Sequence, residues 1–249
     1  MRTLVKAASL VFGALAISAP LAQAADMPIY EPIIETPDVI PLEAAGGWYL
    51  RGDIGYKIYD DPKVKFDHAS LGSVSKVSLD DTWMIGVGAG YKMNDYFRAD
   101  VTLDYEFQSD FKGTVTCVTG CTGATAHAKT DLEVFTTLVN AYVDLGTYSG
   151  ITPYVGGGIG AAYLKTGKIT SDLGKAGNGD DQWNFAWALT AGASYAFTDR
   201  LALDVNYRYL NLGEASLGKV TTPCLCEASA KTSTIDAHEI RVGLRYTMF

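Results

Sequence analysis

The stretch WNFAWALTAGASYAF, residues 183–197, decides the fold class of this 249-residue chain. Every second position holds a bulky or apolar residue, and the positions between them are small or polar. Successive side chains of a β-strand point to opposite faces, so this period of two predicts a strand with one apolar face and one small face. The apolar positions are Trp183, Phe185, Trp187, Leu189, Ala191, Ala193, Tyr195 and Phe197.

The same alternation recurs along the chain after Gly47. It predicts eight strands, at residues 48–59, 82–91, 96–108, 132–145, 151–164, 183–197, 200–211 and 238–248. The segment 151–164 is glycine-rich and the least regular, while Leu138 and Tyr142 interrupt the polar side of the segment 132–145. The chain is therefore predicted to be all-β.

The connections between these strands alternate strictly between short and long. Short turns lie near residues 92–95, 146–150 and 198–199, whereas long loops run through about 60–80, 109–131, 165–182 and 212–236. This layout is typical of an antiparallel up-and-down transmembrane β-barrel, with short periplasmic turns at one end and long extracellular loops at the other. An even number of strands brings the last strand back beside the first, which closes the sheet and removes its edges.

A soluble eight-stranded ligand carrier would show the same alternation with its faces reversed. The small residues on the polar face decide between the two, because a soluble surface would hold Lys and Glu there. Inside a narrow barrel, small residues leave room for long charged side chains of neighbouring strands. The membrane barrel is the interpretation we favour, and the small positions are Gly86, Gly88, Gly90, Ala186, Ala188 and Gly192.

Aromatic residues collect towards both ends of the apolar face. Tyr and Trp favour the headgroup level of a bilayer because each has an apolar body and a polar tip. The pattern predicts two girdles in contact with outer-membrane lipid. Near the long loops stand Trp83, Tyr105, Phe107, Phe135, Tyr163, Trp183 and Tyr209, and near the turns stand Trp48, Tyr91, Phe97, Phe197 and Tyr246.

The N-terminus has the pattern of an export signal. Arg2 and Lys6 precede an apolar run that ends in the small-x-small sequence Ala22-Gln23-Ala24. We expect a signal peptide at residues 1–24, a Pro-rich periplasmic linker at 25–47 and the barrel at 48–249. A retained N-terminal anchor is the alternative, although Pro20 interrupts the run and shortens it below the length of a spanning helix.

The charge balance argues against nucleic acid as a partner. Removal of residues 1–24 leaves 18 basic against 28 acidic residues, a net charge of −10. Nucleic acid binding relies on clustered Lys and Arg that displace counterions from phosphates.

The polar face predicts a network of charges inside the barrel. An eight-stranded barrel is just filled by side chains, and an isolated buried ion is costly, so pairing of opposite charges is expected. Either these pairs form a structural plug, or their rearrangement opens a narrow path for ions or small solutes. The predicted inward charges are Arg51, Asp53, Lys57, Arg98, Asp100, Asp104, Glu106, Asp144, Asp204, Arg208, Glu239, Arg241 and Arg245.

Four cysteines lie in the second and fourth long loops, Cys117 and Cys121 in one and Cys224 and Cys226 in the other. Disulfides are the expected state in an exported chain, and three connectivities are open. A bond between Cys224 and Cys226 would be strained, which favours pairing across the loops. A metal site with His127 matches no zinc spacing, and we interpret residues 178–181 as a solvated turn rather than a calcium site.

No catalytic constellation is expected. His68 and Ser70 have a spacing found in lipid A deacylases, but they fall in a predicted loop without an orienting carboxylate, so we treat the spacing as coincidence. His238 is expected to be an interfacial residue. The chain is predicted to be neither an enzyme nor a cofactor-binding protein.

Several motifs make the chain similar to a known family. Gly47-Trp48-Tyr49 opens the first strand, Pro153-Tyr154-Val155-Gly156-Gly157-Gly158 opens the fifth, and Val242-Gly243-Leu244-Arg245-Tyr246 precedes the terminal Phe249. Across residues 47–249 the sequence resembles the small outer-membrane β-barrel proteins of alphaproteobacteria, which are related in fold to OmpX and to the transmembrane part of OmpA.

The resemblance implies an integral protein of a Gram-negative outer membrane that supports the envelope and presents its loops as a surface antigen or adhesin to a host or surface ligand. A porin-like channel of low conductance is the alternative. Phe249 resembles the signal that the barrel-assembly machinery reads, although Tyr246 lies three rather than two positions before it. Either Phe249 shares a bulge with Met248 or the last residues leave the strand.

Overall fold

The computed structural model describes residues 46–66, 73–116, 125–172, 174–221 and 227–248, and it is built from antiparallel strands. Eight of these are long: β1 (Gly47–Tyr59), β4 (Thr82–Lys92), β5 (Phe97–Thr116), β6 (Thr125–Asp144), β7 (Ile151–Thr166), β10 (Asp181–Ala196), β11 (Leu201–Thr221) and β12 (Glu227–Thr247). Four short strands lie between them: β2 (Val64–Phe66), β3 (Ser73–Leu79), β8 (Ile169–Ser171) and β9 (Gly174–Gly177).

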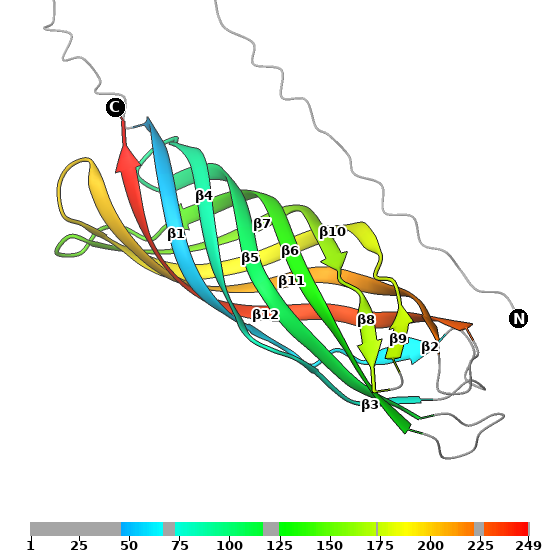
Figure 1. Cartoon of the computed structure of the whole chain (residues 1–249). Helices are drawn as coiled ribbons and strands as arrows, with labels where there is room; N and C mark the ends of the chain where they lie inside the picture. The colour runs from blue at the N-terminus through cyan, green and yellow to red at the C-terminus, as the bar shows by residue number, and fades with distance from the viewer. Residues whose placement is uncertain (1–45, 67–72, 117–124, 173, 222–226, 249) are drawn as a thin grey trace, which may run out of the picture. The chain divides into compact units, whose positions relative to one another are not determined.

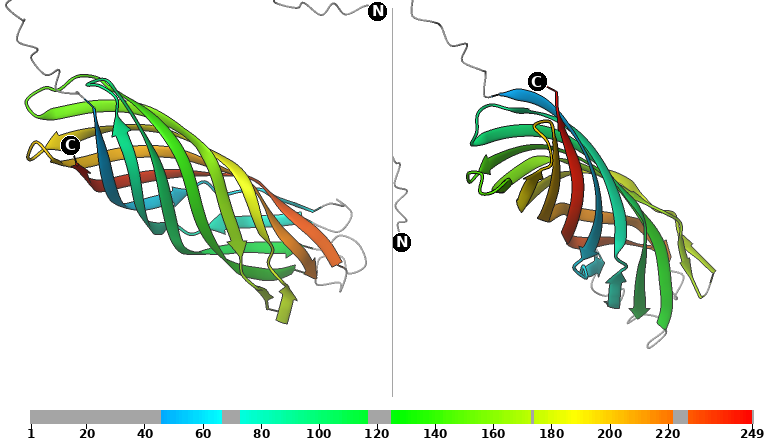
Figure 2. Two further views of the ribbon diagram at one scale, coloured as in Figure 1. Left: turned by 90° about the horizontal axis from the view of Figure 1, so that it is seen from above. Right: turned by 90° about the vertical axis from the view of Figure 1, so that its left-hand side faces the viewer.

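The eight long strands close into a ring. Each pairs with the next long strand along the chain, and β12 pairs with β1. Ile54 of β1, for example, stands opposite Ile85 of β4 on one side and Val242 of β12 on the other. The strands run obliquely around the barrel (Figures 1 and 2). The predicted up-and-down barrel of eight strands is confirmed.

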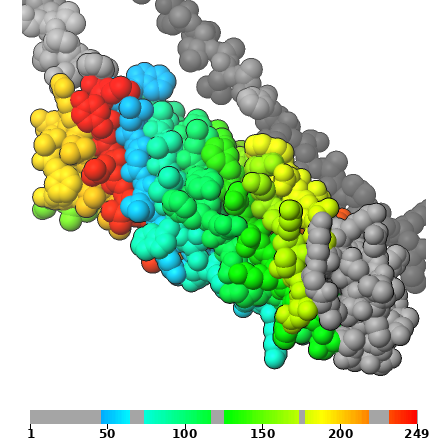
Figure 3. All heavy atoms as spheres, in the orientation of Figure 1, coloured from blue at the N-terminus to red at the C-terminus, as the bar shows by residue number. Residues whose placement is uncertain are grey.

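The orientation of the two faces is also confirmed, since the polar face points inward. Along β1, the odd positions from Gly47 to Tyr59 are buried and the even ones are largely exposed. The exposed set is apolar and forms a belt around the barrel, which includes Ile54, Ile85 and Val139. Figure 3 shows this outer wall as continuous over β12, β1, β4 and β5.

Glycines on the inner face make room for charged side chains, as the sequence predicts. A Cβ atom at Gly86 would overlap with the carboxylate of Asp104, and one at Gly243 would overlap with that of Asp53. Ala186 and Ala188, two further small residues on the inner face, are fully buried.

Several strands extend farther into the predicted long loops than the sequence pattern indicates. β5 and β6 continue as a hairpin to Thr116 and Thr125, and β11 and β12 continue to Thr221 and Glu227. The predicted ends at residues 108 and 211 coincide with irregularities in register, between Glu106 and Ser109 and between Asn211 and Glu214. A bulge adds a residue to one strand and so reverses which positions face inward, which hides the continuing strand from a period-two pattern.

The polarity of the wall inverts beyond these bulges. Phe111, Val115 and Leu132 point inward and are buried, whereas Lys112 and Lys129 are exposed on the outside. Towards the turns the arrangement is the opposite, with charges inside and apolar residues outside. The outer apolar belt therefore ends at a definite level, near the loop-side aromatic residues.

The turn end is compact. Gly146, Ser149 and Gly150 adopt positive φ in the connection between β6 and β7, which lets the chain reverse tightly. Among the described residues, no helix is long and apolar enough to span a membrane.

Candidate functional site

The middle of the lumen is organised around Arg241 of β12. Its Nη2 atom lies 2.8 Å from Asp104 Oδ1 and 3.2 Å from Asp53 Oδ2, and its Nη1 atom lies 3.4 Å from Glu239 Oε2. Arg208 shares the same acceptor group, with Nη1 3.0 Å from Asp104 Oδ2. One guanidinium thus contacts three carboxylates that come from β1, β5 and β12.

A second cluster lies beside it. The ammonium group of Lys57, which is fully buried, contacts Glu106 and lies 2.9 Å from Glu239 Oε1. The hydroxyl of Tyr59 donates a hydrogen bond to Glu106. Because Glu239 contacts both Lys57 and Arg241, the two clusters form one continuous network.

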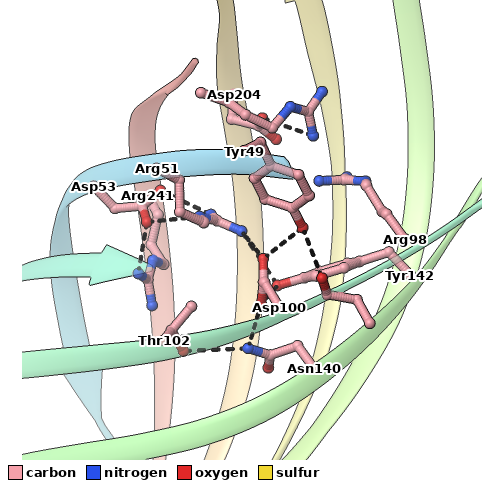
Figure 4. Close-up of polar contacts among 12 residues, drawn as sticks. Tyr49, Arg51, Asp53, Arg98, Asp100, Thr102, Asn140, Tyr142, Asp204 and Arg241 are labelled. Atoms are coloured by element: carbon pink, nitrogen blue, oxygen red, sulfur yellow. Dashed lines mark hydrogen bonds and ion pairs between the residues drawn. The ribbon is translucent and has the colours of Figure 1, made fainter. Parts of the chain in front are cut away.

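Towards the turns, the network is organised around Asp100 of β5. Arg51 lies 2.8 Å from Asp53 and 3.2 Å from Asp100, and Figure 4 shows it reaching between the two carboxylates. The hydroxyl of Tyr49 and the amide of Asn140 donate further hydrogen bonds to Asp100, of 3.0 and 2.8 Å. These neutral donors fix the orientation of a carboxylate that has one cationic neighbour.

Two further ion pairs complete this end. Arg98 Nε lies 3.0 Å from Asp144 Oδ1, and its guanidinium stands over the rings of Tyr142 and Tyr154, 4.5 and 4.2 Å from their centroids. Arg245 lies 3.3 Å from Asp204. Below them, a depression of about 440 Å³ opens at the turn end, with Tyr49, Arg98 and Asp144 among the residues that line it.

All thirteen charged residues predicted for the lumen point inward, and each makes at least one ion pair. They comprise six cations and seven carboxylates from five of the eight barrel strands. Removal of charges from water is costly unless each finds partners of opposite sign. Mutual pairing of opposite charges inside a narrow barrel is the arrangement that limits this cost.

An apolar layer lies on the loop side of these charges, and the sequence pattern placed only Leu138, Ala186 and Ala188 of it on the inner face. It consists of inward side chains from both the barrel and the hairpins that extend it. The buried members are Tyr59, Leu79, Phe111, Leu132, Val134, Leu138, Ala162, Leu164, Ile169, Ala186, Ala188, Leu210, Leu212, Ala215, Leu217, Ile235 and Ala237. Such packing excludes water and braces the hairpins from within.

The outer face of the β5–β6 hairpin carries an exposed charge cluster. Lys112 lies 2.5 Å from Asp80, and Lys129 lies 2.8 Å from Asp110. The hydrogen bond from Lys129 lowers the pKa of Asp110, and the hydrogen bond to Asp80 raises the pKa of Lys112. In solvent such pairs contribute little to stability, so this face offers charges of both signs to a partner.

The predicted girdle residues point outward and are exposed or half-buried. Several form ring pairs, such as Trp48 with Tyr91 at 5.3 Å on the turn side and Trp183 with Tyr163 at 5.0 Å on the loop side. The remaining girdle positions on the outer wall are Trp83, Phe97, Tyr105, Phe107, Phe135, Phe197, Tyr209 and Tyr246.

The remaining residues considered from the sequence either lie outside the described residues or form no binding site within them. Cys117, Cys121, Cys224, Cys226, His68, Ser70 and Phe249 lie outside the described residues. His127 is exposed and lies 3.2 Å from Thr114, and no group of His, Cys, Asp and Glu within the described ranges could hold a metal ion. Asp181, expected in a solvated turn, begins β10 and accepts a hydrogen bond from Tyr163.

Comparisons with known proteins agree with this geometry. The family model described as outer membrane protein beta-barrel domain matches residues 10–247. An uncharacterised protein of Brucella melitensis is 35% identical over 93% of this chain and 94% of its own. A putative adhesin of Rickettsia prowazekii is 29% identical over 80% of this chain and 86% of its own. The crystal structure of the outer membrane protein OprG from Pseudomonas aeruginosa shares the fold, with a TM-score of 0.53, 19% identity and coverage of 82% of this chain and 98% of that one.

Proposed function

Because this chain belongs to the outer membrane β-barrel protein family, we propose that it is a non-conducting barrel that presents rigid β-hairpins outside the outer membrane as an adhesive surface. The observation that carries this proposal is that two kinds of side chain fill the lumen. Paired charges occupy its middle and turn side, and apolar side chains occupy its loop side.

The apolar layer keeps the hairpins ordered. Phe111 and Leu132 point inward from the extended parts of β5 and β6, so these parts pack as a core instead of hanging as free loops. A surface whose backbone is already ordered loses less conformational entropy on binding than a mobile loop does. The relative from Rickettsia prowazekii named as a putative adhesin supports the same role.

The low-conductance channel remains the weaker alternative. A conducting path would require several carboxylates to give up buried partners at once, because Arg241 alone contacts Asp53, Asp104 and Glu239. Loss of an existing current after exchange of Arg98 or Asp104 would favour the channel.

We also infer how the chain is exported and inserted into the outer membrane. The cationic and apolar start of the sequence supports cleavage after Ala24, and the Pro-rich composition supports a periplasmic linker up to the start of β1. The barrel-assembly machinery is the expected biogenesis partner, since β12 alternates apolar residues up to Tyr246 and pairs with β1 to close the ring.

The adhesive role predicts that shortening one hairpin lowers attachment without loss of the barrel. Lys112 and Lys129 stand opposite each other, so residues 113–128 can be replaced by an Asn-Gly turn that suits a two-residue hairpin. We expect cells that display this variant to attach to host-cell monolayers several-fold less than cells that display the parent barrel.

The control for attachment is Arg200→Met, which alters an exposed residue at the turn end. Surface amounts of the three barrels must first be shown to be equal. Attachment of the shortened variant at the level of the parent and of R200M would contradict the adhesive role of this hairpin.

A further inference from the structure

A constellation of three residues repeats at the loop side of every hairpin of the barrel. On the strand that returns from the hairpin, an acidic residue stands two positions before an aromatic ring, and a tyrosine stands opposite that ring on the outgoing strand. The four sets are Tyr56 with Trp83 and Asp81, Tyr105 with Phe135 and Glu133, Tyr163 with Trp183 and Asp181, and Tyr209 with His238 and Asp236.

In three of the sets the tyrosine links the ring to the carboxylate. The hydroxyls of Tyr56, Tyr163 and Tyr209 lie 3.5, 2.9 and 2.8 Å from their aspartate oxygens. The centroids of the paired rings lie 5.3, 5.0 and 5.5 Å apart in the same order. Each tyrosine therefore holds a carboxylate beside an aromatic face in a fixed arrangement.

The fourth set differs in its contacts. Glu133 lies 3.3 Å from Lys165, and the ring of Tyr105 packs against Phe107 at 5.5 Å. Its carboxylate is thus engaged by a cation, so we leave this set out of the proposal.

The constellation lies where the outer wall changes polarity. Trp83 and Trp183 are 57% and 65% exposed at the loop-side edge of the apolar belt. Asp81 and Asp181 lie just beyond this edge, towards the hairpins that carry the exposed charges. In an outer-membrane barrel this edge is the level of the headgroups in the outer leaflet.

We propose that these three Tyr–aromatic–Asp sets bind sugar rings in the headgroups of outer-leaflet glycolipids. An aromatic face can pack against the apolar C–H face of a sugar, while an ionised carboxylate is an acceptor only and suits sugar hydroxyls as donors. Hydrogen bonds to a charged acceptor are stronger than neutral ones. A phosphate group, being an anion and without donors, would be repelled by the same carboxylate.

The turn-side girdle lacks this chemistry. Trp48 packs against Tyr91 in a similar ring pair, but the residues two positions farther towards the turn end are Gly46 and Met93. Asp95 stands two positions before Phe97, but the residue opposite Phe97 is Val143, so the turn side lacks the tyrosine that would link the ring to the carboxylate.

The test is the retention of glycolipid by the whole refolded barrel. The D81N/D181N variant and the D95N/D199N variant each remove two exposed negative charges, the first pair at the loop side and the second at the turn side. Each barrel is placed in nanodiscs that contain lipopolysaccharide and phospholipid, with a chelator present, and native mass spectrometry counts the lipopolysaccharide molecules that remain bound.

We expect about a tenfold smaller bound fraction for D81N/D181N, in line with the loss of charge-assisted hydrogen bonds, and no change for D95N/D199N. Equal retention in the two variants would overturn the proposal, and so would higher retention in D81N/D181N, which would mean that the carboxylates only repel phosphates. Loss of lipopolysaccharide from the parent barrel on chelation would also overturn it, because a divalent cation would then be the link. None of these outcomes depends on whether the hairpins are adhesive.

Discussion

Replacement of Arg241 by methionine is expected to destabilise the barrel by about 3–5 kcal/mol, the usual cost of removing one partner from a buried ion pair. Methionine fills much of the arginine volume, so the main effect is electrostatic. The carboxylates of Asp53, Asp104 and Glu239 would lose a shared cation, and Asp104 would keep only Arg208. Denaturant unfolding of the refolded barrel in lipid vesicles, followed by Trp fluorescence, measures the change.

Two further variants make this result specific. R200M applies the same replacement to an exposed turn residue and should change the free energy of unfolding by less than about 0.5 kcal/mol. Addition of Asp104→Asn to R241M removes one of the stranded carboxylates and should recover part of the loss. An R241M barrel as stable as R200M would show that the lumen charges do not depend on one another.

Replacement of Val87 by arginine is expected to cost about 2–4 kcal/mol, as for a cation on the lipid face near the middle of a bilayer. Val87 is 60% exposed and lies midway along β4 between Trp83 and Tyr91. On a soluble protein, a charge at such an exposed strand position would change stability by less than about 0.5 kcal/mol. The sign and size of the effect therefore report which solvent surrounds the belt.

The matched control is Thr125→Arg, at an exposed position where β6 begins beyond the belt. It should leave the free energy of unfolding in vesicles nearly unchanged. If V87R and T125R had equally small effects, the apolar belt would not be in contact with lipid.

The barrel could be predicted from the sequence because its membrane-facing half follows one rule with few exceptions. Between Phe97 and Phe107 each outward residue is apolar or aromatic and each inward one is polar, and between Trp83 and Tyr91 only the buried Met84 departs from the alternation of apolar and small residues. The period of two in the sequence therefore indicates directly which residues face lipid and which face the lumen. The inward charges follow from the same alternation, although the partner of each charge depends on register and could not be read from one strand.

The extended hairpins could not be predicted for two physical reasons. A bulge near Phe107 and another near Gly213 shift the inward positions by one, so that Phe111 and Ala215 fall on the wrong parity. Beyond the belt the solvent changes from lipid to water, and the apolar residues move from the outside to the inside. The polar segment from Ala126 to Asp131 hence looks like a loop, although it continues β6.

Part of the Tyr–aromatic–Asp sets is visible in the sequence. Asp81-Thr82-Trp83 and Asp181-Gln182-Trp183 share a spacing, and Asp236-Ala237-His238 repeats it with histidine. Only the register shows that Tyr56, Tyr163 and Tyr209 stand opposite these rings, because the pairing joins residues at separations of 20 to 29 positions.

We propose that paired charges and an apolar layer close the lumen. Planar-bilayer recording of the purified, refolded barrel tests it most directly. We expect the membrane to stay electrically silent after insertion at voltages where a known porin conducts, with folding of the barrel verified by its gel mobility. Steady unitary openings of the parent barrel that change in size in the D104N variant would contradict it, since ions would then pass through the network around Arg241.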